Sequence, residues 1–172
     1  MKKGVIAFSI VCLASAFAAD GDFQKQKNAA IDLKKTLMGE LKVKMSESPA
    51  VAVDFCSKNA MEITKAVAKK HGLNIKRVSE KNRNPQNAAD ENDKKALMQF
   101  AESLKQNGKP QSYVVVDNKY YEPLITNEMC IVCHGKDGVI SKETKEKIKQ
   151  NYPADKAIGY GVGELRGAIV IW

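Results

Sequence analysis

Five consecutive residues, Cys130 to His134, constrain this chain more than any other feature of its sequence. Two cysteines stand three positions apart, and a histidine follows at once. On a helix, residues three apart are neighbours on one face, so both thiols can reach the same flat ligand. Cys-x-x-Cys-His is the attachment pattern of c-type haem, in which the thiols add to the vinyl groups of one porphyrin and the histidine ligates the iron. The motif therefore predicts one covalently attached haem c, held by Cys130 and Cys133, with His134 as the proximal ligand.

Three other uses of these cysteines stay open from the residues alone. A thiol redox pair of the thioredoxin kind belongs near a strand–helix–strand unit, which the sequence does not indicate. A structural zinc site needs four ligands, and Cys56 and His71 are the remaining candidates, but no second paired motif is present. A disulfide across only two intervening residues would be strained. Haem attachment is the interpretation that the spacing favours.

The N-terminal stretch has the composition of an export signal. A short basic start precedes an apolar run, and Ala16 and Ala18 form the small-x-small pattern of a cleavage site. We expect residues 1–18 to be a signal peptide and residues 19–172 to form a single domain in a bacterial periplasm. The apolar run is too short to serve as a membrane anchor, and no later segment is apolar enough to span a bilayer.

The net charge of +8 does not by itself indicate a nucleic-acid partner. The lysines are spread along the chain and mixed with apolar or acidic residues, which is typical of solvated helical faces. We therefore expect no nucleic-acid partner, although a basic surface can favour docking onto acidic proteins. A chain of 172 residues can bury a core without the help of disulfides.

Apolar periodicity and turn residues predict the order of the secondary structure. Ser48-Pro49 is expected to start a helix that Gly72 ends, and Asp117-Asn118 is expected to be a hairpin turn. The expected helices cover residues 22–46, about 48–70, about 91–106 and 141–150, and the expected strands cover 73–79, two runs within 112–125, and 166–172. Because the strands do not alternate strictly with helices, the predicted fold class is α+β, with a small antiparallel sheet and an N-terminal antiparallel pair of helices.

One proximal histidine leaves the opposite face of a haem iron without a ligand. His71, the second histidine, lies in a lysine-rich helix end, where an exposed cation is the ordinary role. Methionines at helical spacing usually fill the core, and Met129 is too close to Cys130 to reach the far face. Met61, Met98 and Met129 are among the methionines that offer a thioether sulfur as a distal ligand.

Cys56 is the remaining thiol candidate. Cys12 would be removed with the signal peptide, and the haem would consume the two cysteines of the motif, so Cys56 would be an odd thiol in an oxidising compartment. A lone cysteine is commonly a small buried hydrophobe, yet a thiolate is also a competent haem ligand. The residues alone leave both roles open for Cys56.

The sequence resembles a family of periplasmic c-type haem domains, once known only as a domain of unknown function. Its members occur alone or ahead of histidine kinases and chemoreceptors. The resemblance covers about residues 28–172. It is carried, in order, by AVDFC (52–56), IKRVSEKNRNPQN (75–87), the Cys-x-x-Cys-His motif with its following glycine, and YPADKAIGYGVGELRGA (152–168).

The resemblance implies a PAS-like antiparallel sheet flanked by helices, with one haem bound through Cys130 and Cys133. It implies His134 as the proximal ligand and Cys56 as the distal ligand of the iron. Separately, Arg77 and Arg83 are candidates to pair with the haem propionates, because guanidinium groups match carboxylates.

A His/Cys ligand pair indicates a haem that responds to redox state or to small gases such as nitric oxide or carbon monoxide. The alternative is a monohaem cytochrome that carries electrons in a respiratory chain. We do not expect an enzyme, because the distal position would be filled. Since the sequence ends at Trp172 without a membrane helix or output domain, we expect any signal to pass to a separate redox or signalling partner.

Overall fold

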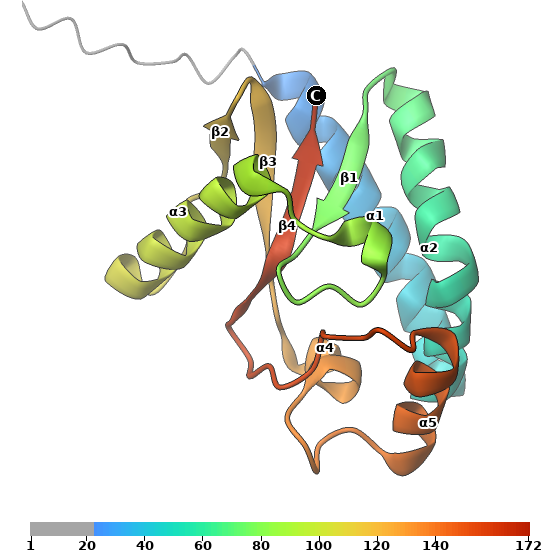
Figure 1. Cartoon of the computed structure of the whole chain (residues 1–172). Coiled ribbons are helices and arrows are strands. Elements are labelled where there is room, and N and C mark those ends of the chain that lie inside the picture. The colour runs from blue at the N-terminus through green and yellow to red at the C-terminus, as the bar shows by residue number, and fades with distance from the viewer. Residues whose placement is uncertain (1–22) are drawn as a thin grey trace, which may run out of the picture.

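The computed structural model describes residues 23–172, so the predicted signal peptide lies outside the described residues. Five α-helices and four strands follow one another in the described range (Figure 1). They are α1 (Gln24–Glu47), α2 (Pro49–His71), β1 (Ile75–Val78), α3 (Glu91–Asn107), β2 (Val114–Val116), β3 (Lys119–Ile125), α4 (Glu128–His134), α5 (Lys142–Asn151) and β4 (Leu165–Ile171). A short 3-10 helix, Pro85–Asn87, lies between β1 and α3. The predicted α+β class is confirmed.

Helices α1 and α2 form the predicted antiparallel pair along one side of the molecule (Figure 1). The Ser48 hydroxyl accepts a hydrogen bond from the amide of Val51 at 3.2 Å, and Pro49 is the first residue of α2. The first amides of a helix have no partner within the helix. Ser48 accepts a hydrogen bond from one of them, and proline at the first position has no amide hydrogen that needs a partner. Gly72 ends α2 in the left-handed conformation, with φ of 60°.

The sheet is antiparallel throughout and has the strand order β1-β4-β3-β2. Strands β2 and β3 are joined by Asp117 and Asn118, both of which have positive φ, at 52° and 58°. Two positive φ values are the requirement of a type I′ turn, whose twist matches that of the strands. In this strand order, the C-terminal strand β4 lies in the centre of the sheet, between β1 and β3 (Figure 1).

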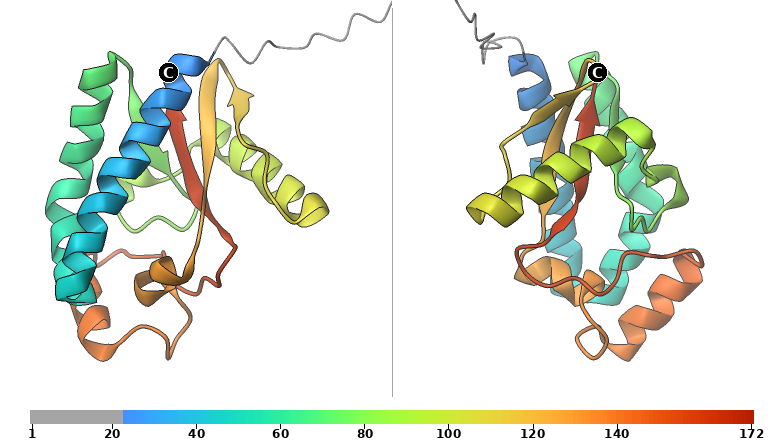
Figure 2. Two further views of the ribbon diagram at one scale, coloured as in Figure 1. Left: turned by 180° about the vertical axis from the view of Figure 1, so that it is seen from behind. Right: turned by 60° about the vertical axis from the view of Figure 1, so that its left-hand side comes forward.

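Helices cover both faces of the sheet, with the α1–α2 pair on one face and α3 on the other (Figure 2). Successive residues of the central strands alternate between the two cores, as the strand period of two requires. The core against α1 and α2 consists of Ala29, Ala30, Leu33, Val67, Tyr120, Ile169 and Ile171. The core against α3 consists of Val78, Ala96, Leu97, Phe100, Val114, Tyr121, Ala168 and Val170.

Phe100 is the largest apolar side chain of the α3 core and is fully buried. We expect Phe100→Ala to lower the free energy of unfolding by about 3–5 kcal/mol, because the substitution leaves a cavity that packed neighbours cannot fill. Met98→Ala on the same helix is the matched control, since Met98 is 56% exposed, and we expect it to change stability by less than about 0.5 kcal/mol. Urea denaturation followed by circular dichroism measures the free energy of unfolding of both variants. Equal losses of stability in Phe100→Ala and Met98→Ala would mean that α3 does not pack against the sheet as described.

A further group of elements, α4, α5 and the loops around them, lies beyond one end of the sheet (Figure 1). Helix α5 packs against α2, where Val53, Ile140 and Ile148 form a small separate core. The loop after α5 returns to α4, and the amides of Gly159 and Tyr160 donate to the carbonyls of Gly135 and His134. The Cys-x-x-Cys-His motif is thus held between the end of the sheet and the loop that returns after α5. Within residues 23–172, no helix is long and apolar enough to cross a membrane.

Candidate cofactor site

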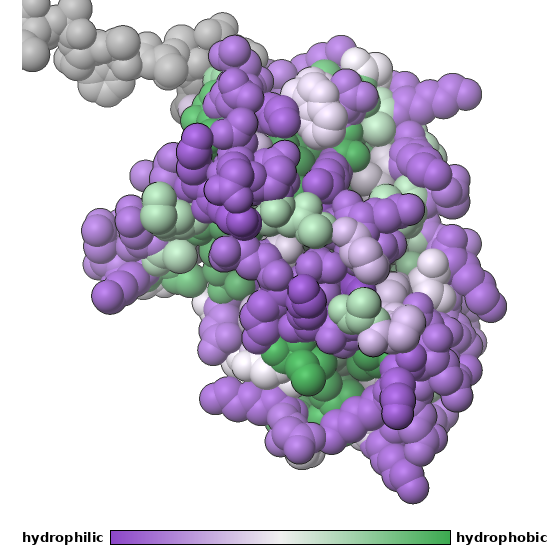
Figure 3. All heavy atoms as spheres, viewed as in Figure 1, coloured by the Kyte–Doolittle hydropathy of each residue, from purple (hydrophilic) through white to green (hydrophobic). Residues whose placement is uncertain are grey.

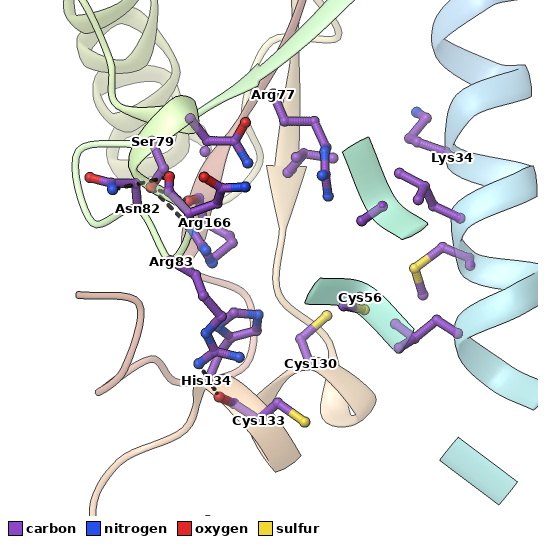
Figure 4. A pocket seen from close by; sticks show the side chains of 18 of the residues that line it. Lys34, Cys56, Arg77, Ser79, Asn82, Arg83, Cys130, Cys133, His134 and Arg166 are labelled. Atoms are coloured by element: carbon purple, nitrogen blue, oxygen red, sulfur yellow. Dashed lines mark hydrogen bonds between the residues drawn. The ribbon is translucent and has the colours of Figure 1, made fainter. Parts of the chain in front are cut away.

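A cavity of about 430 Å³ lies between the α1–α2 pair, the end of the sheet and α4. Its volume is in the range of pockets that hold small molecules and cofactors. Hydrophobic residues gather in the region of α4 between hydrophilic surroundings (Figure 3). All six side chains that the sequence indicated as site residues line this one cavity: Cys56, Arg77, Arg83, Cys130, Cys133 and His134 (Figure 4).

Helix α4 presents the two cysteines of the motif to the cavity. The Asn127 side-chain oxygen accepts hydrogen bonds from the amide of Cys130 at 3.1 Å and from its thiol at 3.2 Å, so it starts the helix and orients the first cysteine. At the other end, the amide of Gly135 donates to the carbonyl of Ile131 at 2.8 Å. A Cβ atom at Gly135 would lie 2.4 Å from that same oxygen, so the tight end of α4 requires glycine.

The imidazole of His134 has the tautomer and the protonation state that a metal ligand needs. Its Nδ1 lies 2.7 Å from the carbonyl oxygen of Ala157. Because a carbonyl only accepts, Nδ1 carries the proton and Nε2 keeps a free lone pair. Burial, with help from the Arg83 and Arg166 charges, holds the pKa of His134 well below its usual value, so the ring is neutral at neutral pH. A neutral imidazole anchored through its other nitrogen is the form in which histidine binds metals.

Arg83 fastens the loop after α5 to the motif. Its guanidinium donates from Nε to Asp155 Oδ1 at 3.1 Å and from Nη2 to Asp155 Oδ2 at 3.2 Å. Nη2 also donates to the carbonyls of Cys133, at 2.6 Å, and Ala157, at 3.3 Å. The carbonyl that orients His134 is therefore held by the same cation that contacts α4. Whether Arg83 also contacts a haem propionate stays a prediction.

We expect Arg83→Lys to lower the free energy of unfolding by about 3 kcal/mol, although the charge is kept. Lysine cannot reproduce the fork that meets both oxygens of Asp155, and both side chains are largely buried, at 12% and 8% exposure. Urea denaturation of the haem-free chain checks this. Lys81→Arg in the same loop is the control, because Lys81 is exposed and arginine can keep both of its contacts, with the carbonyl of Ile158 and the face of the Tyr160 ring. If Arg83→Lys destabilises the chain no more than Lys81→Arg does, the role of the fork is contradicted.

Cys56 lies on α2, on the side of the cavity toward which the Cys130 side chain points (Figure 4). Burial raises the pKa of the Cys56 thiol, and the charges of Arg77 and Arg83 oppose that rise. Burial likewise raises the pKa of the Cys133 thiol, and the charge of Arg83 opposes that rise. The fold thus brings together three cysteines from two distant parts of the chain.

Of the other distal ligands that the sequence offers, some line the cavity and some lie far from it. His71 Nε2 lies 2.9 Å from Asp32 Oδ2 at the far end of α2, about 22 Å along the helix from Cys56. Met98 is exposed on α3, whereas Met61 and Met129 line the cavity. Among residues 23–172, no group of three or more histidine, cysteine or acidic side chains is arranged to hold a metal ion directly.

Sequence reasoning missed Arg166, which also lines the cavity. Its Nη1 donates to the Ser79 hydroxyl at 2.8 Å and to the carbonyl of Lys81 at 3.1 Å. The buried Nε atom of Arg166 has no hydrogen-bond partner, and the same is true of Nε of Arg77. A single arginine at the start of a terminal strand carries no sequence signal of its own, except that it lies inside the 152–168 stretch on which the resemblance rests.

Comparisons with known proteins agree with this fold. The crystal structure of the cyanobacterial haem protein Tll0287 matches with a TM-score of 0.64 over 90% of this chain and 95% of that one. The two sequences are 23% identical, so this match supports the fold alone. No curated protein matches the chain. The family model described as Tll0287-like matches residues 13–172, which confirms the predicted resemblance: the chain belongs to the Tll0287-like family.

Proposed function

We propose that the cavity binds one haem c, attached through thioethers to Cys130 and Cys133, with His134 and Cys56 as the axial ligands of its iron. The observation that carries this proposal is the opening of the Cys-x-x-Cys-His motif into the same cavity as Cys56. A solved protein of this fold is described as a haem protein, which supports the proposal.

The residues around the cavity fit such a group. Apolar side chains from α1, α2 and β3 line a large part of the wall, as a porphyrin face requires, and they include Leu37, Met38, Leu41, Met45, Ala52, Val53, Phe55, Ala60, Leu124 and Ile125. The lone pair on Nε2 of His134 is left free by the hydrogen bond at Nδ1. Haem would supply one-electron redox chemistry and affinity for small gases.

We favour a sensor of redox state or of small gases such as nitric oxide or carbon monoxide. A thiolate ligand stabilises ferric iron, so the reduction potential should be low. Burial raises the pKa of the Cys56 thiol, so this side chain would favour its protonated, unbound form if a bond to iron were weakened. Release of Cys56 would free space within the cavity for a small neutral ligand.

The alternative is an electron carrier, which keeps the same ligands in both redox states. Stopped-flow reduction of the haem-loaded protein, with spectra recorded throughout, separates the two functions. For a sensor we expect loss of the thiolate signature on reduction and binding of carbon monoxide. Rapid, reversible reduction with the ligand signature retained and no carbon monoxide binding would favour the carrier.

The remaining parts of this proposal concern location and partners. Residues 1–18 would direct export to the periplasm as a cleavable signal peptide, leaving one domain of residues 19–172. We propose no enzymatic activity, because Cys56 would fill the distal position. A separate redox or signalling protein would be the partner, and nucleic acid would not.

A further inference from the structure

We infer that Arg77 and Arg166 form an anion pocket that holds the two propionate carboxylates of the haem, while Arg83 serves to position His134. This inference rests on the proposed function and deepens it. Among residues 23–172, four cationic side chains line the cavity, Lys34, Arg77, Arg83 and Arg166, and no aspartate or glutamate does.

Two of the four cations are already neutralised by carboxylates just outside the wall. Lys34 forms an ion pair with Glu122, and Arg83 forms one with Asp155. Within residues 23–172, neither Arg77 nor Arg166 has a carboxylate oxygen within ion-pair distance. The cavity therefore carries two positive charges that no ion pair within residues 23–172 neutralises.

Arg77 projects from β1 toward the cavity and is poorly satisfied (Figure 4). The only hydrogen bond of its side chain within the described residues runs from Nη2 to the sulfur of Met61 at 3.9 Å, and a thioether is a weak acceptor. Its Nε is buried without a partner. A buried cation without a counter-charge is costly, so this side chain fits a site that receives an anion from a ligand.

Arg166 offers a second donor on the neighbouring strand, β4. Its Nη1 is used by Ser79 and Lys81, which fixes the guanidinium in place and leaves the buried Nε without a partner. The oxygen of the Asn87 side chain is also buried and unpaired at this cavity, so the wall near the sheet is polar. Guanidinium groups form strong, directed hydrogen bonds to carboxylates.

The cavity thus suits a ligand with an apolar body and two carboxylates. Haem has this chemistry, with its two propionates on one edge. The cysteines of α4 hold the opposite part of the cavity wall from Arg77 (Figure 4). A porphyrin bound at its vinyl groups by α4 would therefore direct its propionates toward the sheet.

The test uses the haem-loaded protein and follows the haem-methyl proton resonances from about pH 3 to about pH 7. An adjacent cation favours the ionised form of a carboxyl and lowers its pKa, so removing the cation raises that pKa. We expect Arg77→Met and Arg166→Met each to raise the pKa of one propionate titration by about one to two units relative to the parent protein. Lys34→Met is the matched control and should leave the titration unchanged, because Lys34 is already paired with Glu122.

A second measurement separates ligand binding from a structural role of Arg77. In the haem-free chain, Arg77→Met should leave the thermal unfolding midpoint unchanged or raise it, because it removes an unpaired buried charge. In the haem-loaded protein the same substitution should lower the midpoint. Equal destabilisation of both forms, or failure of the haem-free variant to fold, would show a structural role and overturn the inference.

The outcomes also distinguish this inference from the proposed function. A normal haemochrome spectrum with an unaltered propionate titration in both arginine variants would overturn the anion pocket and leave haem binding intact. If Arg77→Met loses the thiolate signature but leaves the pKa values of the propionates unchanged, the anion pocket is also overturned, because Arg77 would then act on Cys56. Absence of covalent haem from the parent protein would defeat the proposed function itself.

Discussion

Cys56→Ser is expected to remove the thiolate signature from the ferric haem-loaded protein while leaving the haem attached. The hydroxyl of serine has almost the same size as the thiol, but it does not ionise near neutral pH and is a poor iron ligand. The cavity wall should therefore be preserved while the distal ligand is lost. Ultraviolet–visible and paramagnetic resonance spectra of the oxidised protein measure the change.

Met61→Leu is the matched control for this experiment, because Met61 is the rival sulfur ligand on the same helix and lines the same cavity. It should leave the thiolate signature unchanged. If Met61→Leu alters the ferric spectrum and Cys56→Ser does not, the distal ligand has been assigned to the wrong sulfur. The pair of variants thus decides between the two side chains of α2.

The double variant Cys130→Ser/Cys133→Ser is expected to lose covalent haem completely. No thioether can form without a thiol, so any remaining haem should be extractable with acidified organic solvent. Each single variant should keep one attachment and a reduced haem content. Haem staining after denaturing electrophoresis measures the covalent fraction.

Cys56→Ser serves as the internal control here, since it removes a thiol from the same cavity without removing an attachment point. It should retain full covalent staining. Staining that persists in the double variant would mean that the haem is attached elsewhere. Loss of staining in Cys56→Ser as well would mean that Cys56 takes part in attachment rather than only in ligation.

Local signals in the sequence predicted the elements well. Ser48-Pro49, Gly72 and Asp117-Asn118 each fix the backbone at one place by short-range chemistry, and the structure has a helix start, a helix end and a hairpin turn there. The sequence also predicted a terminal strand over residues 166–172, and the structure has β4 there. These features depend on residues that are close together in the sequence, so short sequence patterns predict them.

The organisation of the site depends on contacts between distant segments. Arg83 and Asp155 are 72 positions apart, and nothing near either residue indicates its partner. The role of the Ala157 carbonyl in orienting His134 is a backbone contact, for which any residue type could serve. Sequence reasoning therefore found the residues that carry chemistry but not the groups that hold them.

The structure gives a physical reason for two stretches on which the family resemblance rests. Residues 75–87 contain Arg77 and Arg83, and residues 152–168 contain Asp155 and Arg166. Side chains from both stretches surround the cavity or fasten the loop that orients His134. Their shared place around one site explains why such loop-like segments carry so specific a pattern.

The central claim is that this chain holds one haem by covalent bonds to α4. Mass spectrometry of the matured protein under denaturing conditions tests it most directly, with peptide mapping of the modified segment. We predict a mass increase of one haem, located on the peptide that contains Cys130 and Cys133. An unmodified mass from cells that mature other c-type cytochromes normally would contradict the claim.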